Sequence, residues 1–326
     1  MDVAAGHQRR VAVVGATGAV GSQLAELLCE RGFPFSELRL FASPESAEPA
    51  LEFNDQRYPV HPLRDPADLT GFEVAFLAVP PSAASEIIHA RPGPLLIDLS
   101  AAGRMPSGVP MAAPALTPRE RMLDLGGQMV LATPHPAAEA IAGVIKALGV
   151  ESSFIGATLM LSASSRGKEE VADLILQSAD LLNAHLNLEE DEPQIAFNVF
   201  LDDQEAELTA AISGQVAELL GHPALLMVRV LRVPVLHGTG LAIFVPAAAT
   251  EGWRDKLSAA PGMLMLEDDD PAGIVDAMNQ EAVCASATIG PSGLALWCVF
   301  DSARRAAMAA MWIAECALPA TSAAIN

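Results

Sequence analysis

The sequence predicts an α/β protein with a doubly wound, Rossmann-type dinucleotide-binding domain and a second, α+β domain on a mixed sheet. The apolar run Arg10–Val14 enters a glycine-rich turn and leaves it as an amphipathic helical pattern. Short apolar strands and helical patterns alternate over roughly the first 130 residues, which favours a parallel sheet. After Pro134 the elements become longer and change their order. A length of 326 residues fits two such domains.

The turn after the first strand carries three glycines at three-residue spacing. Such a turn lets a pyrophosphate approach the backbone, and the N–H groups and dipole of the following helix favour its charge. The alternative is a strand, turn and helix that bind nothing. The residues expected to line this site are Gly15, Thr17, Gly18, Ala19, Val20 and Gly21.

The elements of the first domain follow from apolar runs and helical spacing. The predicted strands are Arg10–Val14, Leu38–Phe41, Val74–Ala78, Leu95–Asp98 and Gln128–Ala132. The predicted helices are Gly21–Arg31 and Ser82–Arg91.

The second half contains longer apolar strands and helices. The predicted helices are Ala137–Leu148, Lys168–Leu186, Asp203–Leu220 and Ser302–Leu318, and the strands are Ser153–Ala163, Leu225–Val235, Gly240–Pro246 and Leu294–Phe300. The run Leu159–Leu161 predicts a strand buried on both faces. The last helix is apolar enough to pack back on the first domain. We therefore expect a first domain of residues 1–132 completed by 302–326, and a second domain of residues 133–301.

Composition excludes several classes of partner. The chain has 40 acidic and 19 basic residues and a net charge of −21, which disfavours nucleic acid and anionic membrane surfaces. No secretory signal and no apolar run of membrane-spanning length is recognised. The four cysteines show no metal-type spacing, so we expect free thiols, no metal site and a cytoplasmic setting.

Several segments together resemble the aspartate-semialdehyde dehydrogenase family, in order along nearly the whole chain. They are Gly15–Gly21, Ile97–Ser100 with Gly103–Met105, Phe197–Val199, Arg232–Val235, Gly293–Trp297 running to Asp301, and Ile313–Glu315. The resemblance implies a dinucleotide-binding domain completed by the C-terminal helix, and a second domain that carries catalysis and a dimer interface. It also implies a cysteine nucleophile, a histidine acid/base and NADP as hydride acceptor.

The catalytic positions depart from that family. Pro136 stands where the resemblance places the nucleophile, and proline cannot attack a carbonyl. Thr239 stands at the place of the histidine, with His237 two residues earlier and on the same face if the strand continues. His237 and His135 are the remaining catalytic candidates. The alternative is that each is an ordinary polar residue of the fold.

The cofactor positions depart as well. Glu45 stands where the resemblance implies a basic residue for the 2′-phosphate of NADP. A carboxylate repels that phosphate but can accept a bond from a ribose hydroxyl, as in NAD sites. The run Ala78–Pro81 replaces a cofactor-lining segment, and its two prolines remove two N–H donors. The sequence predicts NAD in preference to NADP, with weak binding or none as the alternative.

The substrate positions are mixed. Arg232 remains where the resemblance implies a clamp for a substrate carboxylate, and Arg104 where it implies phosphate binding. Polar family positions are replaced at Leu161, Ala211, Gln215 and Trp312. A largely apolar cleft holds an arginine only if the charge is paired. Arg232 therefore either binds a small external anion or meets an internal carboxylate.

The family's fold motifs remain while its chemical motifs are lost, a pattern that resembles the divergent Usg-type proteins. We expect a homodimer that binds a ligand or regulates without dehydrogenase activity. The alternative is an NAD(P)-dependent oxidoreductase that acts on an aldehyde or oxo group in amino-acid biosynthesis. A third interpretation is an enzyme of different chemistry that uses His135 and His237.

Overall fold

The computed structural model describes residues 9–46, 50–100, 109–125, 127–151, 153–185, 193–246, 251–267 and 272–318. The chain divides into two compact units. The first runs to His135 and includes the chain from Ala306 onward, and the second is Pro136–Arg305. The sequence predicts these boundaries after residues 132 and 301. The observed second boundary, after Arg305, falls one turn into the last helix, Ser302–Ala317.

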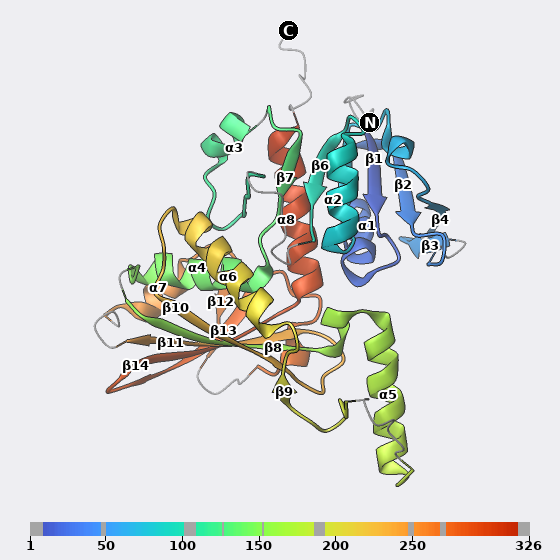
Figure 1. Cartoon of the computed structure of the whole chain (residues 1–326). Coiled ribbons are helices and arrows are strands. Elements are labelled where there is room, and N and C mark those ends of the chain that lie inside the picture. The colour runs from blue at the N-terminus through green and yellow to red at the C-terminus, as the bar shows by residue number, and fades with distance from the viewer. Residues whose placement is uncertain are drawn as a thin grey trace. The chain divides into compact units, whose positions relative to one another are not determined.

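The first unit is a doubly wound sheet, as the sequence predicts. Its strand order is β3-β4-β2-β1-β5-β6-β7, and all neighbours are parallel except β3 with β4 (Figure 1). The strands are β1 Arg9–Val14, β2 Phe35–Ala42, β3 Ala50–Phe53, β4 Gln56–Pro62, β5 Val74–Leu77, β6 Leu95–Asp98 and β7 Val130–Ala132. The helices are α1 Ala19–Glu30, α2 Pro81–Ala90 and α3 Arg119–Leu125, with the 3-10 turn η1 Pro66–Leu69.

Two apolar layers bury the faces of this sheet. One layer includes Val13, Leu24 and Phe76, and it is completed by α8 (Ser302–Ala317), whose Ala310 and Ile313 are fully buried in it. The opposite layer packs Leu77 and Ile87. Strands that are buried on both faces consist of continuous apolar runs, which explains why the interior strands of this sheet could be predicted from the sequence.

The β3–β4 hairpin was not predicted. It turns at Asn54 and Asp55, both in the left-handed region at φ 49° and 59°, a conformation that suits a two-residue hairpin. Its strand β4 is polar and carries two prolines, so its composition does not indicate a strand. It is nevertheless held at the sheet by parallel pairing with β2.

The second unit is built on a mixed sheet of order β12-β13-β14-β11-β8-β10-β9. Its strands are β8 Ile155–Leu161, β9 Phe200–Leu201, β10 Leu226–Arg232, β11 Thr239–Pro246, β12 Met263–Met265, β13 Val283–Gly290 and β14 Gly293–Phe300. Its helices are α4 Pro136–Leu148, α5 Lys168–Leu182, α6 Glu205–Leu220 and α7 Trp253–Ser258, with 3-10 turns η2 Ala163–Arg166 and η4 Ile274–Ala277. The sequence missed β9, β12, β13 and α7.

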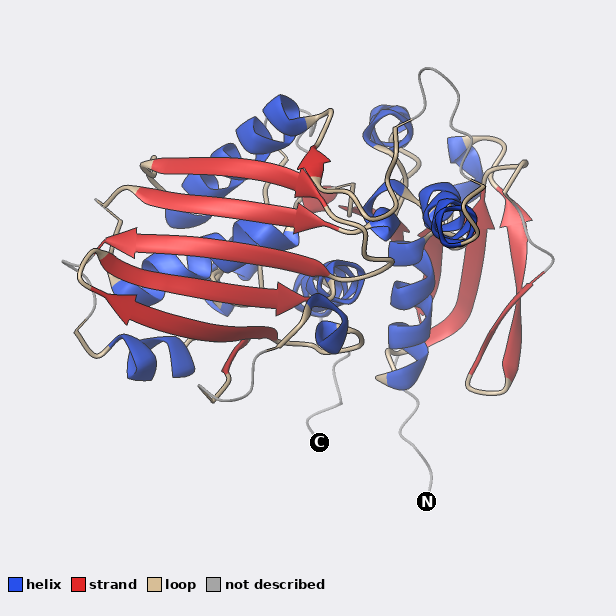
Figure 2. Cartoon of the chain, turned by 90° about the horizontal axis from the view of Figure 1, so that it is seen from below, coloured by secondary structure: helices blue, strands red, loops and turns tan. Residues whose placement is uncertain are grey.

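Helices cover one face of this sheet and leave much of the other open within the described residues (Figure 2). In β8, Leu159 and Leu161 are buried while Met160 between them is half-buried. The expectation that this strand is buried on both faces is therefore not met within one chain. The strand instead alternates between a helix-covered face and an open one.

A buried ion pair ties the start of α8 to α4 within the second unit. The Arg305 guanidinium donates to a Glu139 carboxylate oxygen at 2.9 Å and to the carbonyl of Glu281 at 2.8 Å. Both charged side chains are under a tenth exposed. Such a pair is costly to break from one side, since the remaining charge would be buried alone.

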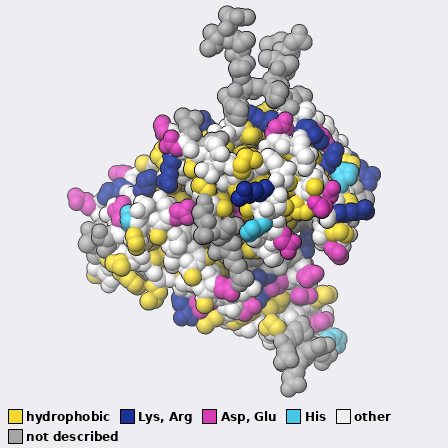
Figure 3. All heavy atoms as spheres, turned by 45° about the horizontal axis from the view of Figure 1, so that its top comes forward, with side chains coloured by type: hydrophobic (Ala, Val, Ile, Leu, Met, Phe, Trp, Pro, Cys, Tyr) yellow, Lys and Arg dark blue, Asp and Glu magenta, His cyan; other side chains and the backbone are white. Residues whose placement is uncertain are grey.

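Two further features bear on the predicted partners. On the face shown in Figure 3, basic side chains lie in small groups beside acidic ones. Among the described residues, no helix has both the length and the apolar character needed to span a membrane.

Candidate functional site

The predicted dinucleotide site begins at the turn after β1. Gly15 adopts φ +83°, and the amides of Gly15 and Ala16 donate to the carbonyl of Phe41 at 2.8 and 2.9 Å. These bonds fasten the turn to the end of β2. Gly18 is the N-cap of α1, where no described side chain supplies a cap and the first turn contains no acid. The helix start thus presents backbone donors and a positive dipole end, which suit an anion.

Two of the three glycines are required by packing alone. A Cβ on Gly15 would lie 2.1 Å from the carbonyl oxygen of Ala78, and one on Gly21 would lie 2.1 Å from that of Gly15. A Cβ on Gly18 would lie 3.3 Å from the same Gly15 oxygen, at an ordinary negative φ. Gly18 is consequently the glycine whose identity the fold constrains least. The buried Thr17 lies in the turn, and the more open Ala19 and Val20 begin α1.

Glu45 lies at the same edge of the sheet as the glycine turn. β1 has β2 and β5 as its parallel neighbours, and the winding reverses there. In such sheets, ligands bind outside the carboxyl ends of the strands at this reversal. Glu45 is exposed, three residues beyond the end of β2. Pro80 and Pro81 follow β5 and start α2, where proline fits the helix but offers no N–H.

The position expected for a nucleophile starts a helix instead. Pro136 is buried as the first residue of α4, where its fixed φ favours helix initiation. His135 immediately precedes it and is half-buried. Burial lowers the pKa of His135 from 6.5 to about 4, so the imidazole is neutral at pH 7.

Thr239, at the expected place of the histidine, is a buried hydroxyl. It begins β11, and its Oγ1 lies 2.6 Å from the Oγ of Ser302. His237 is exposed in the connection between β10 and β11. His135 and His237 fall in different units, so a joint role for the two histidines stays a prediction.

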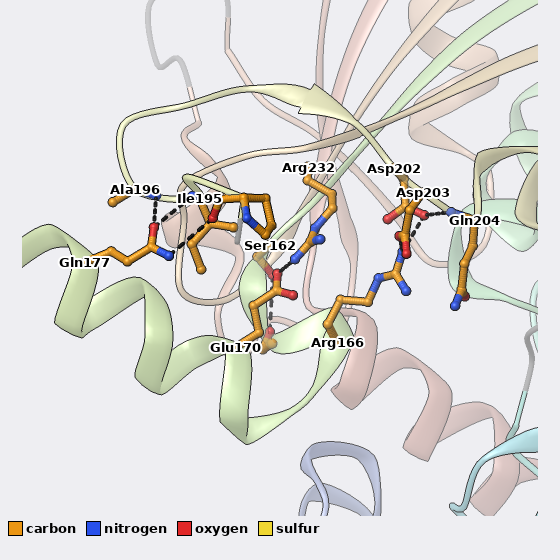
Figure 4. Close-up of polar contacts among 12 residues, drawn as sticks. Ser162, Arg166, Glu170, Gln177, Ile195, Ala196, Asp202, Asp203, Gln204 and Arg232 are labelled. Atoms are coloured by element: carbon orange, nitrogen blue, oxygen red, sulfur yellow. Dashed lines mark hydrogen bonds and ion pairs between the residues drawn. The ribbon is translucent and has the colours of Figure 1, made fainter. Parts of the chain in front are cut away.

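Arg232 has an internal partner. It ends β10 and forms an ion pair with Glu170 of α5 (Figure 4). Its guanidinium carbon lies 5.0 Å from the ring centre of Phe200. The contact with Glu170 is an ion pair rather than an aligned hydrogen bond. The Arg232 side chain is 13% exposed. Of the two alternatives left by the sequence, the contact with Glu170 is the internal carboxylate, and binding of an external anion at Arg232 stays a prediction.

A second arginine beside Arg232 is also paired. Arg166 contacts the carboxylates of Asp202, at 2.5 Å, and Asp203. The pKa of Arg232 is lowered, first by burial and then by the charge of Arg166. We call Arg166, Glu170, Asp202, Asp203 and Arg232 the Arg232 cluster.

Sequence reasoning missed the partners in this cluster. Glu170 has a sufficient local role as an acid in the first turn of α5, so nothing in the chain pointed to a contact with β10. Of the other substrate positions, Leu161 and Gln215 are buried, and Trp312 packs against the first unit's core. Arg104 lies outside the described residues.

None of the four cysteines has the properties of an activated nucleophile. All four lie within the described ranges, and none forms a disulfide. Burial raises the pKa of every one, to about 12 for Cys298. A reactive thiol requires a lowered pKa instead. Within the same ranges, no three His, Cys, Asp or Glu side chains gather in a way that could hold a metal ion.

Comparison with known proteins places these features in a family. Residues 10–123 match the semialdehyde dehydrogenase NAD-binding domain. The chain is 31% identical to an aspartate-semialdehyde dehydrogenase of Synechocystis, over 94% of this chain and 96% of that protein. It is also 31% identical to a USG-1 protein homolog of Pseudomonas aeruginosa, over 91% and 94%. A solved structure described as a probable aspartate-semialdehyde dehydrogenase from Pseudomonas aeruginosa superposes with a TM-score of 0.83 at 30% identity, covering 95% of this chain and 98% of that one.

Proposed function

The chain belongs to the aspartate-semialdehyde dehydrogenase family, and we propose that it is a homodimeric binding or regulatory protein without the family's dehydrogenase activity. The observation that carries this proposal is Pro136. A residue without a thiol, hydroxyl or titratable group occupies the expected nucleophile position and has a structural task at the start of α4.

The surrounding chemistry supports the proposal. Thr239, at the expected place of the acid/base, is buried against Ser302 and does not titrate near neutral pH. The four thiols have raised pKa values, which disfavours a displaced cysteine as nucleophile. The Arg232 guanidinium pairs with Glu170, which disfavours a role as a clamp for a substrate carboxylate. Each change alone would impair the family's dehydrogenase reaction. Together they affect the nucleophile, the acid/base and the carboxylate clamp.

Dinucleotide binding is proposed to persist, with NAD preferred to NADP. The uncapped start of α1 and the close-packed glycine turn fit a pyrophosphate. Glu45 beyond β2 fits a plain ribose hydroxyl and opposes a 2′-phosphate. NAD would thus be a ligand that the protein senses or uses as a structural cofactor, together with a small anionic ligand as a further candidate.

The intact glycine turn also favours a second candidate function, an NAD(P)-dependent oxidoreductase that acts on an aldehyde or oxo group. In this case a displaced nucleophile would replace the lost one. The two candidates differ in whether any single cysteine is essential for turnover.

A turnover assay separates them. Purified protein is mixed with aspartate semialdehyde, phosphate and either NAD or NADP, and reduced nucleotide is followed by absorbance. We expect a rate below about a thousandth of an ordinary enzyme, that is below about 0.01 per second. Calorimetric titration with NAD in parallel reports whether the nucleotide binds in the absence of turnover.

Four single Cys→Ser variants complete the test. Turnover that is lost in one of them identifies a displaced nucleophile and establishes the oxidoreductase. Turnover above the limit that survives all four contradicts the proposal that the missing cysteine abolishes activity. No turnover with measurable NAD binding is the expected result.

A further inference from the structure

The ion pair between Arg232 and Glu170 joins two separate elements of the second unit. Arg232 is the last residue of β10 and pairs across the sheet with Phe200 of β9. Glu170 comes from the first turn of α5. The two side chains are 13% and 20% exposed, so water reaches the pair only in part. The aromatic ring holds one face of the guanidinium while the carboxylate meets one of its nitrogens.

The charges around this pair disfavour an incoming anion. The Arg232 cluster contains two guanidinium groups and three carboxylates, and both guanidinium groups contact carboxylates (Figure 4). An external dicarboxylate would meet a local excess of negative charge. It could reach Arg232 only by displacing a carboxylate that the chain itself supplies.

We propose that Glu170 is an internal counter-ion that closes the Arg232 site to small external carboxylates. A tethered group competes at an effective concentration of about millimolar or more. A free carboxylate of similar intrinsic affinity therefore has to exceed that concentration before it displaces Glu170. Glu170 thereby determines what the site rejects, and this assignment is independent of whether the protein has catalytic activity.

A purely local role for Glu170 does not account for the contact. Acids in the first turn of a helix stabilise it through the dipole, and the exposed neighbour Glu169 already provides such a charge in α5. Of the two, only Glu170 pairs with Arg232. The neighbouring acids thus form a matched pair for experiment, equal in charge and helix position but different in partner.

The test measures succinate binding by calorimetry in the full-length protein and in two single variants, Glu170→Ala and Glu169→Ala. We expect Glu170→Ala to bind succinate at least about tenfold more tightly than the unmodified protein, since it leaves Arg232 with an unpaired, partly shielded charge. Glu169→Ala should behave like the unmodified protein. Adding Arg232→Ala to Glu170→Ala should abolish the new binding.

Two results would overturn the proposal: no gain of affinity in a folded Glu170→Ala protein, or a gain that persists after Arg232→Ala. Should Glu170→Ala fail to fold, Glu170→Gln keeps the shape of the side chain and removes only its charge. The same gain is then expected, accompanied by a rise of Tm with succinate that the unmodified protein lacks.

Discussion

Glu45 is the residue that we expect to decide which dinucleotide the first unit accepts. Its carboxylate lies exposed just beyond β2, at the edge where the glycine turn lies. Changing Glu45→Arg should improve NADP affinity by about tenfold, or roughly 1.4 kcal/mol, because an attraction replaces a repulsion. Calorimetric titration with NAD and NADP measures the change. The exposed Glu52 on β3 provides the control, as Glu52→Arg should alter neither affinity appreciably. Equal affinities for NAD and NADP in the unmodified protein would contradict the assignment.

His135 should make the stability of the protein depend on pH. Its pKa is about 4 when folded and 6.5 otherwise, so the unfolded chain binds more protons between these values. The contribution of His135 to the free energy of unfolding should therefore be present in full above pH 6.5. It should fall by roughly 3 kcal/mol as the pH approaches 4. Urea unfolding at a series of pH values measures the slope.

Substitution identifies the source of that slope. His135→Asn should flatten it, whereas His222→Asn, which changes an exposed histidine, should leave it intact. An unchanged slope in the His135 variant would assign the acid sensitivity to other groups.

At the scale of elements, Gly18 before α1 and Gly21 in its first turn should allow effects on folding and on binding to be measured separately. Gly21→Ala places a Cβ 2.1 Å from the Gly15 carbonyl oxygen, so it should lower the free energy of unfolding by about 1–3 kcal/mol. Gly18→Ala meets the same oxygen at 3.3 Å and adds a side chain at the proposed pyrophosphate site. It should weaken NAD binding while its Tm stays near that of the unmodified protein.

Thermal unfolding and NAD titration of both variants provide the measurements. A Gly18→Ala protein that binds NAD as well as the unmodified chain would mean that the turn serves folding only. Destabilisation by both substitutions to the same extent would contradict the ranking of the two close approaches.

The elements also show where sequence patterns succeed. β6 runs over Leu95–Asp98 as predicted, since the apolar run Leu95–Ile97 is typical of an interior parallel strand. The helix expected to reach Leu186 ends at Leu182, with Asn183 as its C-cap and Ala184 at φ +55°. Leu186 lies outside the described residues. β13 carries small and polar residues and stays in the sheet through its pairing with β14, a contact that no local pattern announces.

At the scale of the whole molecule, we predict a stable dimer that uses the open face of the second sheet. Met227 of β10 and Phe244 of β11 are more than half exposed and lie on either side of Gly156 of β8, which separates the two strands. Met160, four residues farther along β8, is half-buried. An apolar sheet face of this kind favours an isologous partner, with an interface above about 2,000 Å² in total. Light scattering at micromolar concentration should give the mass of a dimer, and unfolding should depend on protein concentration.

A matched pair of substitutions tests the location of the interface. Phe244→Glu should shift the protein to monomers, because a buried unpaired charge at an interface is costly. Met129→Glu, at a residue of similar exposure in the first unit, should remain dimeric. A monomeric mass for the unmodified protein would refute the prediction.

The sequence by itself determined the fold class, the main strands of the first sheet and the glycine turn. These depend on residue type and local spacing, which a chain displays directly. That Pro136 stands at the nucleophile position is implied by the family resemblance. Only the tertiary structure decided the pairing of Arg232 with Glu170, the buried bond of Thr239 to Ser302 and the low pKa of His135. These properties arise from residues distant in sequence or from the extent of burial. The charge that a side chain presents to a ligand depends on its neighbours in space, and the sequence does not display them.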